Sequence, residues 1–191
     1  MDLEQAIQDH FQPIYRSALA MTGDPWEAED LTQETFLVLS ENPSRYQQKS
    51  RLYTWLYGVL LNLDRRRRRR LSLWRKKWRT LCERAWNGPD SRPAAEAPLE
   101  AAEWKDSLWF QVNQLPDPQR QTLVLRFSAE LQYDEIAEIL GCPLGTVKSR
   151  LHHGLAALRE LLQNEGGEQW RQTPSHLDED LVRAALNTPA S

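Results

Sequence analysis

The stretch that most limits how this chain can fold runs from Leu131 to Leu162, LQYDEIAEILGCPLGTVKSRLHHGLAALRELL. Its first part predicts a short amphipathic helix that ends at Gly141. Pro143 suits the first position of a second helix, because its missing N–H would have no partner there. Apolar residues then recur every three or four positions, at Val147, Leu151, Leu155, Leu158 and Leu162. Two amphipathic helices joined by a tight turn are typical of a helix-turn-helix.

The exposed side of the second predicted helix is polar and basic near its start. Its residues there are Thr146, Lys148, Ser149, Arg150, His152 and His153. A DNA-reading helix presents this end to base edges and phosphates, so we predict DNA recognition. The alternative is an ordinary helical hairpin with solvated cations. Gly154 lies within the predicted helix, where glycine costs about 1 kcal/mol relative to alanine.

Charge is strongly segregated along the chain, although the formal net charge is only −3. Residues 1–48 hold two basic and nine acidic residues, whereas residues 49–84 hold thirteen basic and two acidic residues. A block of net charge +11 inside an acidic protein indicates a localised contact with a polyanion. Cys82 and Cys142 form no C-x-x-C pair, so neither a disulfide framework nor a zinc site is predicted. With no signal peptide or membrane-length apolar run, we expect a cytoplasmic protein without membrane insertion.

The N-terminal part predicts two helices. The first has apolar residues from Leu3 to Met21 at helical spacing and should end by Gly23. Asp24 is then expected to cap the second helix, Trp26 to about Ser40, and Glu27 to complete a capping box. One face of this helix is buried by its pattern, and the other presents Asp30, Gln33, Glu34 and Leu37. Taken by itself, the second face is best interpreted as solvated.

Aromatic and basic residues alternate in the next segment. A polar loop from Arg45 to Arg51 leads into the sequence LYTWLY, and six arginines follow at positions 65–70. Aromatic rings stack on unpaired bases while cations hold phosphates, so this segment is typical of single-stranded nucleic-acid binding. For Trp55 and Leu56 the pattern favours core packing instead. The arginine run wraps every face of its helix and is predicted to bind phosphate.

The composition of the rest of the chain indicates where its domains begin and end. Residues 87–98, NGPDSRPAAEAP, predict a flexible linker between a domain at 1–86 and a helix-turn-helix domain at 99–163. In the second domain we expect a helix from Leu99 to Leu115 and another from Gln119 to about Phe127, capped by Asp117. Residues 164–191 form a polar tail, interpreted either as disordered or as carrying one short helix, Ser175 to Leu186.

The order of these parts resembles a known family. AEDLTQETFLVL, the YTWLY block, the arginine-rich helix, the linker and LPDPQRQTLVLRF…YDEIAEILGCPLGTVKSRL are together similar to small extracytoplasmic-function (group 4) sigma factors of bacterial RNA polymerase. The similarity covers about residues 6–162. It implies an all-α fold of two small domains, a region 2 helical bundle and a region 4 helix-turn-helix. It also implies no cofactor, no metal and no catalytic residue.

The resemblance assigns roles to matching positions. Asp30, Gln33, Glu34 and Leu37 match the family's contact with the clamp of the largest polymerase subunit, which replaces the solvated-face interpretation. The second domain is expected to dock on the flap of the second-largest subunit. Residues matching contacts to the minus-ten element and adjacent DNA are Tyr46, Gln47, Gln48, Lys49, Ser50, Arg51, Tyr53, Trp55, Asn62, Arg65, Arg66 and Arg69. Those matching the helix read into the minus-thirty-five major groove are Thr146, Lys148, Ser149, Arg150 and His153.

The expected function is therefore promoter-specific transcription initiation, with core RNA polymerase and promoter DNA as partners and sequestration by an anti-sigma factor as a further hypothesis. Lys49 and Leu52 depart from the family's acidic residue and phenylalanine, so the minus-ten base preference is not carried over. The main alternative is a free-standing helix-turn-helix regulator, which predicts a dimer and a palindromic site. RNA binding through the arginine run is a weaker alternative.

Overall fold

The computed structural model describes residues 3–41, 46, 51–85 and 108–164. Every regular element within these ranges is helical, which confirms the all-α fold class. The expected linker and the tail beyond Asn164 lie outside the described residues, as do residues 99–107 of the helix expected from Leu99 to Leu115. The domain boundaries predicted from composition therefore stay predictions.

Three helices form the N-terminal part: α1 (Leu3–Thr22), α2 (Pro25–Glu41) and α3 (Leu52–Ala85). As predicted, α1 ends before Gly23, whose φ of +71° suits glycine. The Asp24 carboxylate accepts a hydrogen bond from the Glu27 amide at 2.9 Å, which confirms the cap of α2. The prediction that Glu27 completes a capping box is wrong. The Asp24 amide donates to Thr22 Oγ1 at 3.4 Å instead of to Glu27, and the Glu27 carboxylate pairs with Arg67.

The C-terminal part contains α5 (Leu108–Gln114), α6 (Asp117–Leu123), a π-helix η2 (Val124–Ser128), α7 (Tyr133–Leu140) and α8 (Leu144–Asn164). The single helix expected from Gln119 to Phe127 is thus an α-helix continued by a π-helix. Helices α7 and α8 form the predicted helix-turn-helix, and Gly141 between them has a φ of +60°. A capping box of Gln132 and Glu135, which the sequence analysis did not anticipate, begins α7.

Asp117 does not cap α6, contrary to expectation. Pro116 occupies the N-cap position without a side-chain hydrogen bond, and Asp117 lies in the first turn of the helix. Its carboxylate instead pairs with Arg120 Nη2 at 3.2 Å and with Arg68 Nε at 3.5 Å. Two guanidinium groups close by compete successfully with backbone amides for one carboxylate, because charge-assisted hydrogen bonds are the stronger ones.

Gly154 has a packing role in α8 that outweighs its low helix propensity. A Cβ atom built at this position would lie 3.3 Å from Leu123 Cδ1 and 3.4 Å from Gln119 Cβ. The residue is buried, and α8 packs closely on α6 there. The mid-helix glycine therefore lets the two helices approach each other.

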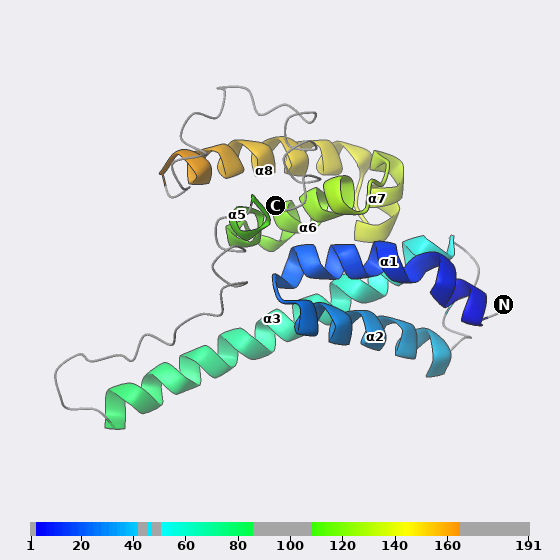
Figure 1. Ribbon diagram of the computed structural model, residues 1–191. Helices are drawn as coiled ribbons and strands as arrows, with labels where there is room; N and C mark the ends of the chain where they lie inside the picture. The colour runs from blue at the N-terminus through cyan, green and yellow to red at the C-terminus, as the bar shows by residue number, and fades with distance from the viewer. Residues whose placement is uncertain (1–2, 42–45, 47–50, 86–107, 165–191) are drawn as a thin grey trace, which may run out of the picture.

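The N-terminal and C-terminal helices pack against each other, α1 on η2 and α3 on α7 (Figure 1). Their buried apolar residues form one continuous core. Asn113 Nδ2 donates to the Ala20 carbonyl at 2.6 Å, and the hydroxyls of Ser17 and Ser128 lie 3.2 Å apart. We call this arrangement, in which η2 packs on α1 and α7 packs on the first half of α3, the closed arrangement.

Candidate nucleic-acid and polymerase interface

The face of α2 singled out in the sequence is exposed. Asp30, Gln33, Glu34 and Leu37 all point to solvent, and the Leu37 side chain retains 55% of its accessible surface. The opposite face, which includes Ala28 and Leu31, packs into the core. Gln33 Nε2 donates a hydrogen bond to Glu29 Oε1, 3.1 Å away on the same helix. An acidic face that also carries an exposed leucine can therefore accept a partner helix.

The aromatic side chains around the start of α3 are half-buried, and Arg51 is exposed. The rings of Tyr46 and Trp55 lie 6.0 Å apart in a tilted arrangement, and both side chains are half-buried. Gln47, Gln48, Lys49 and Ser50, which complete the predicted base-capture loop, lie outside the described residues. Leu56 is fully buried, as expected, whereas Trp55 is at the edge of the core.

Arg51 and Tyr53 both contact the helix-turn-helix part through Glu135 at the start of α7. Arg51 Nη1 lies 3.3 Å from Glu135 Oε1, and the Tyr53 hydroxyl donates to the same oxygen. Burial and the hydrogen bond to Glu135 raise the pKa of Tyr53. The hydrogen bond with Tyr53, together with the Glu135 charge, raises the pKa of Arg51. Two residues expected to contact DNA are thus held by the second domain.

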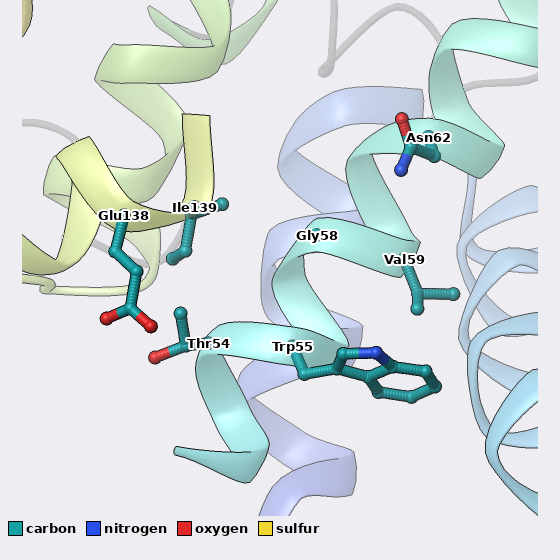
Figure 2. A pocket seen from close by; sticks show the side chains of 7 residues that line it. All are labelled: Thr54, Trp55, Gly58, Val59, Asn62, Glu138 and Ile139. Atoms are coloured by element: carbon teal, nitrogen blue, oxygen red, sulfur yellow. The ribbon is translucent and has the colours of Figure 1, made fainter. Parts of the chain in front are cut away.

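The part of α3 from Thr54 to Asn62, which carries predicted minus-ten contacts, faces α7 across a shallow space of about 280 Å³. Figure 2 shows Thr54, Trp55 and Asn62 of α3 on one side, and Glu138 and Ile139 of α7 on the other. Gly58 and Val59 complete the lining. In the closed arrangement this space leaves little room for a nucleic-acid strand along α3.

The six consecutive arginines of α3, residues 65–70, differ in their surroundings. Arg66, Arg69 and Arg70 are exposed. Arg65 donates to Asn62 Oδ1 at 3.1 Å and to Gln121 Oε1 at 3.4 Å. Arg67 pairs with Glu27 and with Asp64. Arg68 donates a hydrogen bond to Asn113 and pairs with Asp117. Burial and the nearby Arg120 lower the pKa of Arg68. The run therefore combines exposed cations with cations that hold the two parts together.

An ion pair that the sequence analysis missed connects the two parts. Asp64 Oδ2 accepts a hydrogen bond from Arg120 Nη2 at 2.6 Å, and both side chains are completely buried. A signal was present, because Asp64 is an acid four residues after Leu60 on the buried stripe of α3. Its partner could not be found by spacing, since Arg120 is 56 positions away.

The predicted recognition helix has its polar face free. Lys148, Ser149, His152 and His153 are exposed, and Thr146 and Arg150 are half-buried. Arg150 Nη1 lies 3.6 Å from Cys142 Sγ. The opposite face buries Val147, Leu151, Leu158 and Leu162, which confirms the apolar seam. Thus four of the six polar residues lie together on an open surface, whereas Arg51 and Tyr53, predicted to contact the minus-ten element, are held by Glu135.

Within the described residues no group of His, Cys, Asp and Glu is arranged to hold a metal ion. In the same part of the chain, no helix combines the length and apolar character of a membrane span.

Comparisons with known proteins identify both halves. Residues 6–80 match the family Sigma-70 region 2, and residues 105–158 match Sigma-70, region 4. The chain is 32% identical over 172 residues to the ECF RNA polymerase sigma factor EcfG of Rhodopseudomonas palustris, covering 88% of this chain and 86% of the relative. It is also 32% identical to the ECF RNA polymerase sigma factor SigW of Bacillus subtilis, over 79% of this chain and 83% of the relative.

A solved structure shows the same fold. The sigma factor RpoE from Bartonella quintana, in complex with the anti-sigma factor NepR, is similar with a TM-score of 0.55 and 24% identity, over 85% of this chain and 97% of that chain. The two family matches fall on the two helical parts described above. The alignments with the two relatives cover more than three quarters of this chain and of each relative. The chain belongs to the extracytoplasmic-function sigma factors of the sigma-70 family, which direct RNA polymerase to promoters and initiate transcription there.

Proposed function

We propose that the exposed face of α2 is the main contact with the largest subunit of core RNA polymerase. The observation that carries this is the exposure of Asp30, Gln33, Glu34 and Leu37 together, on a helix whose other face is anchored in the core. An exposed leucine beside polar and acidic side chains is typical of a protein–protein contact. The free-standing regulator offers no use for this face.

The minus-ten element is proposed to bind Tyr46, the loop at 47–50, Arg51, and the α3 face that carries Tyr53, Trp55 and Asn62. Arg65, Arg66 and Arg69 would contact the adjacent duplex. Stacking of bases on aromatic rings offsets the free energy, roughly a few kcal/mol, that is needed to unstack and unpair a base. Because α7 faces this part of α3 and Glu135 holds Arg51 and Tyr53, the two parts must separate before the strand can bind.

The minus-thirty-five element is proposed to bind the free polar face of α8, through Thr146, Lys148, Ser149, Arg150 and His153. This surface is open even in the closed arrangement. We propose that core polymerase separates the two parts and fixes their spacing, so that both elements are bound together. The free protein is then expected to bind promoters weakly.

No enzymatic step is needed for this function, because promoter opening follows from binding energy alone. Since transcription initiation takes place in the bacterial cytoplasm, we propose that the protein acts there. An anti-sigma factor is proposed as a further partner, since the structurally similar RpoE is bound by the anti-sigma factor NepR.

The decisive experiment combines purified protein with sigma-free core polymerase and a promoter library. We expect complex formation and open-complex formation with the native chain and loss of both in Asp30→Lys/Glu34→Lys. A matched control is Asp9→Lys/Glu160→Lys, which makes the same charge change at exposed positions on α1 and α8. Equal core binding by both variants would reject the α2 contact. Tight duplex binding without core binding would favour the free-standing regulator.

A further inference from the structure

The second half of α3 carries an apolar stripe on which no described helix packs. Beyond the arginine run α3 projects from the body as a lone helix (Figure 1). Trp74, Trp78 and Leu81 retain 60%, 56% and 48% of their accessible surface. Large apolar side chains gathered on a projecting helix mark an interaction surface, whereas singly scattered ones do not. We call Leu71, Trp74, Trp78 and Leu81 the α3 stripe.

The α3 stripe has the spacing of a coiled-coil seam. Its residues follow one another by three, four and three positions, which places them on one narrow face over about three turns. The Trp74 and Trp78 rings stack with centroids 5.5 Å apart and an interplanar angle of 4°, so they cover this face together. The surface is therefore shaped to receive one further helix along its length.

Charges beside the α3 stripe restrict which helix can bind. In the heptad assignment, Arg70, Arg75 and Lys77 occupy the flanking positions, and Lys76 points away from the seam. No acidic residue occurs from 65 to 81. A second copy of the same stripe would bring like charges together across the seam, which is unfavourable. The partner helix should instead have apolar seam residues with acidic flanks.

The chain contains such a segment in its own tail. We propose that residues 175–186, SHLDEDLVRAAL, bind to the α3 stripe within the same molecule. Leu177, Leu181 and Ala184 have the spacing of a seam, and Asp178 and Asp180 occupy its flanking positions. Pairing the two segments brings these carboxylates beside Arg70, Arg75 and Lys77 and covers the exposed tryptophans. In the heptad assignment Glu179 occupies the position opposite the seam, as Lys76 does in α3.

Connection through the chain makes this pairing feasible. Ten residues, 165–174, join the end of α8 to the segment, and such a stretch spans up to about 35 Å when extended. The end of α8 and the projecting half of α3 lie on the same side of the body (Figure 1). Helices this short are marginal alone, but a short linker supplies an effective concentration on the order of millimolar.

Hydrogen exchange in the full chain and in a chain ending at residue 174 tests the proposal. We expect amides in residues 71–81 to exchange about tenfold more slowly in the full chain. This is the slowing that results when the tail is docked in about nine-tenths of the molecules and exchange occurs only in the rest. Asp178→Lys/Asp180→Lys should abolish this difference, and adding Arg75→Glu/Lys77→Glu should restore it. The matched control, Glu168→Lys/Glu179→Lys, makes the same charge change away from the seam and should keep the protection.

Three results would overturn the proposal. Equal exchange in the full and shortened chains would show that the tail does not cover the α3 stripe. Protection that increases with protein concentration would assign the stripe to the tail of a second copy. Protection that arises only when vesicles of phosphatidylglycerol are added would assign it to an anionic lipid surface. Circular dichroism of each variant verifies that α3 keeps its helix content.

Discussion

Asp64 of α3 and Arg120 of α6 form a completely buried ion pair, 2.6 Å between Oδ2 and Nη2, that joins region 2 to region 4. Arg67 Nη2 lies 3.4 Å from the other Asp64 oxygen, and Asp117 lies 3.2 Å from Arg120. These side chains form a chain of alternating charge across the domain contact. The closed arrangement therefore depends on a polar connection inside an apolar core.

Removing one partner of the Asp64–Arg120 pair is expected to be costly. Asp64→Asn removes the buried carboxylate partner of Arg120 and leaves this guanidinium only the half-exposed Asp117, so the free energy of unfolding should fall by about 3 kcal/mol. Asp64→Leu/Arg120→Met should lose much less, because no buried charge remains. Arg51→Ala, which breaks an exposed pair with Glu135, should change it by less than about 1 kcal/mol. Urea denaturation measures all three, and equal losses in the first and third variants would contradict the assigned roles.

Salt dependence should distinguish the arginines that contact DNA. Arg66 and Arg69 are exposed, so each is expected to neutralise about one phosphate in the holoenzyme–promoter complex. Arg66→Ala and Arg69→Ala should each reduce the slope of log K against log salt by about one. Arg16→Ala, at an exposed position on α1, serves as the control and should leave the slope unchanged. An unchanged slope for both α3 variants would remove them from the DNA interface.

Alanine substitutions at two helical glycines should differ in effect. At Gly58 a Cβ atom would meet nothing within 4 Å, so Gly58→Ala should raise the free energy of unfolding by about 0.5–1 kcal/mol. At Gly154 it would lie 3.3 Å from buried Leu123, so packing strain should cancel or exceed the same gain. Thermal and urea unfolding of both variants measure the difference. Similar stabilisation of both would show that α6 and α8 readily adjust.

Tyr53 should make the closed arrangement sensitive to alkaline pH. Its pKa in the folded protein is raised by burial and by the hydrogen bond to Glu135. The contribution of this hydrogen bond is therefore complete below the ordinary tyrosine pKa of about 10 and is lost as the pH rises through the raised value. A phenolate beside the Glu135 carboxylate repels it, so the two parts should separate.

A distance measurement between labels on α3 and α7 from pH 8 upward tests this expectation. The native chain should show a separation step above about pH 10, and Tyr53→Phe should lack that step. Tyr57→Phe is the control, because Tyr57 is buried and its hydroxyl donates to the Pro13 carbonyl, 3.4 Å away, within the N-terminal part. A step that persists in Tyr53→Phe would assign the transition to another group.

Local patterns by themselves determined most of the secondary structure. Gly23, Asp24 and Gly141 end or begin helices through backbone conformations and caps that involve only neighbouring residues. The apolar seam from Val147 to Leu162 follows from spacing, so the helix-turn-helix and its free polar face were predictable. The exposed face of α2 was predictable for the same reason, although its role required the family resemblance.

Tertiary structure alone decided which charges and aromatics remain free. In the sequence Arg67 and Arg68 look like phosphate-binding residues and Asp117 like a helix cap, yet all three bind partners from distant helices. Gly154 looks like a weakness in a helix, yet it admits Leu123 of α6. The Asp64–Arg120 pair and the contact of Tyr53 with Glu135 join residues far apart in the chain. Spacing along a sequence encodes the face of a helix, whereas a partner across a domain contact depends on how whole helices pack.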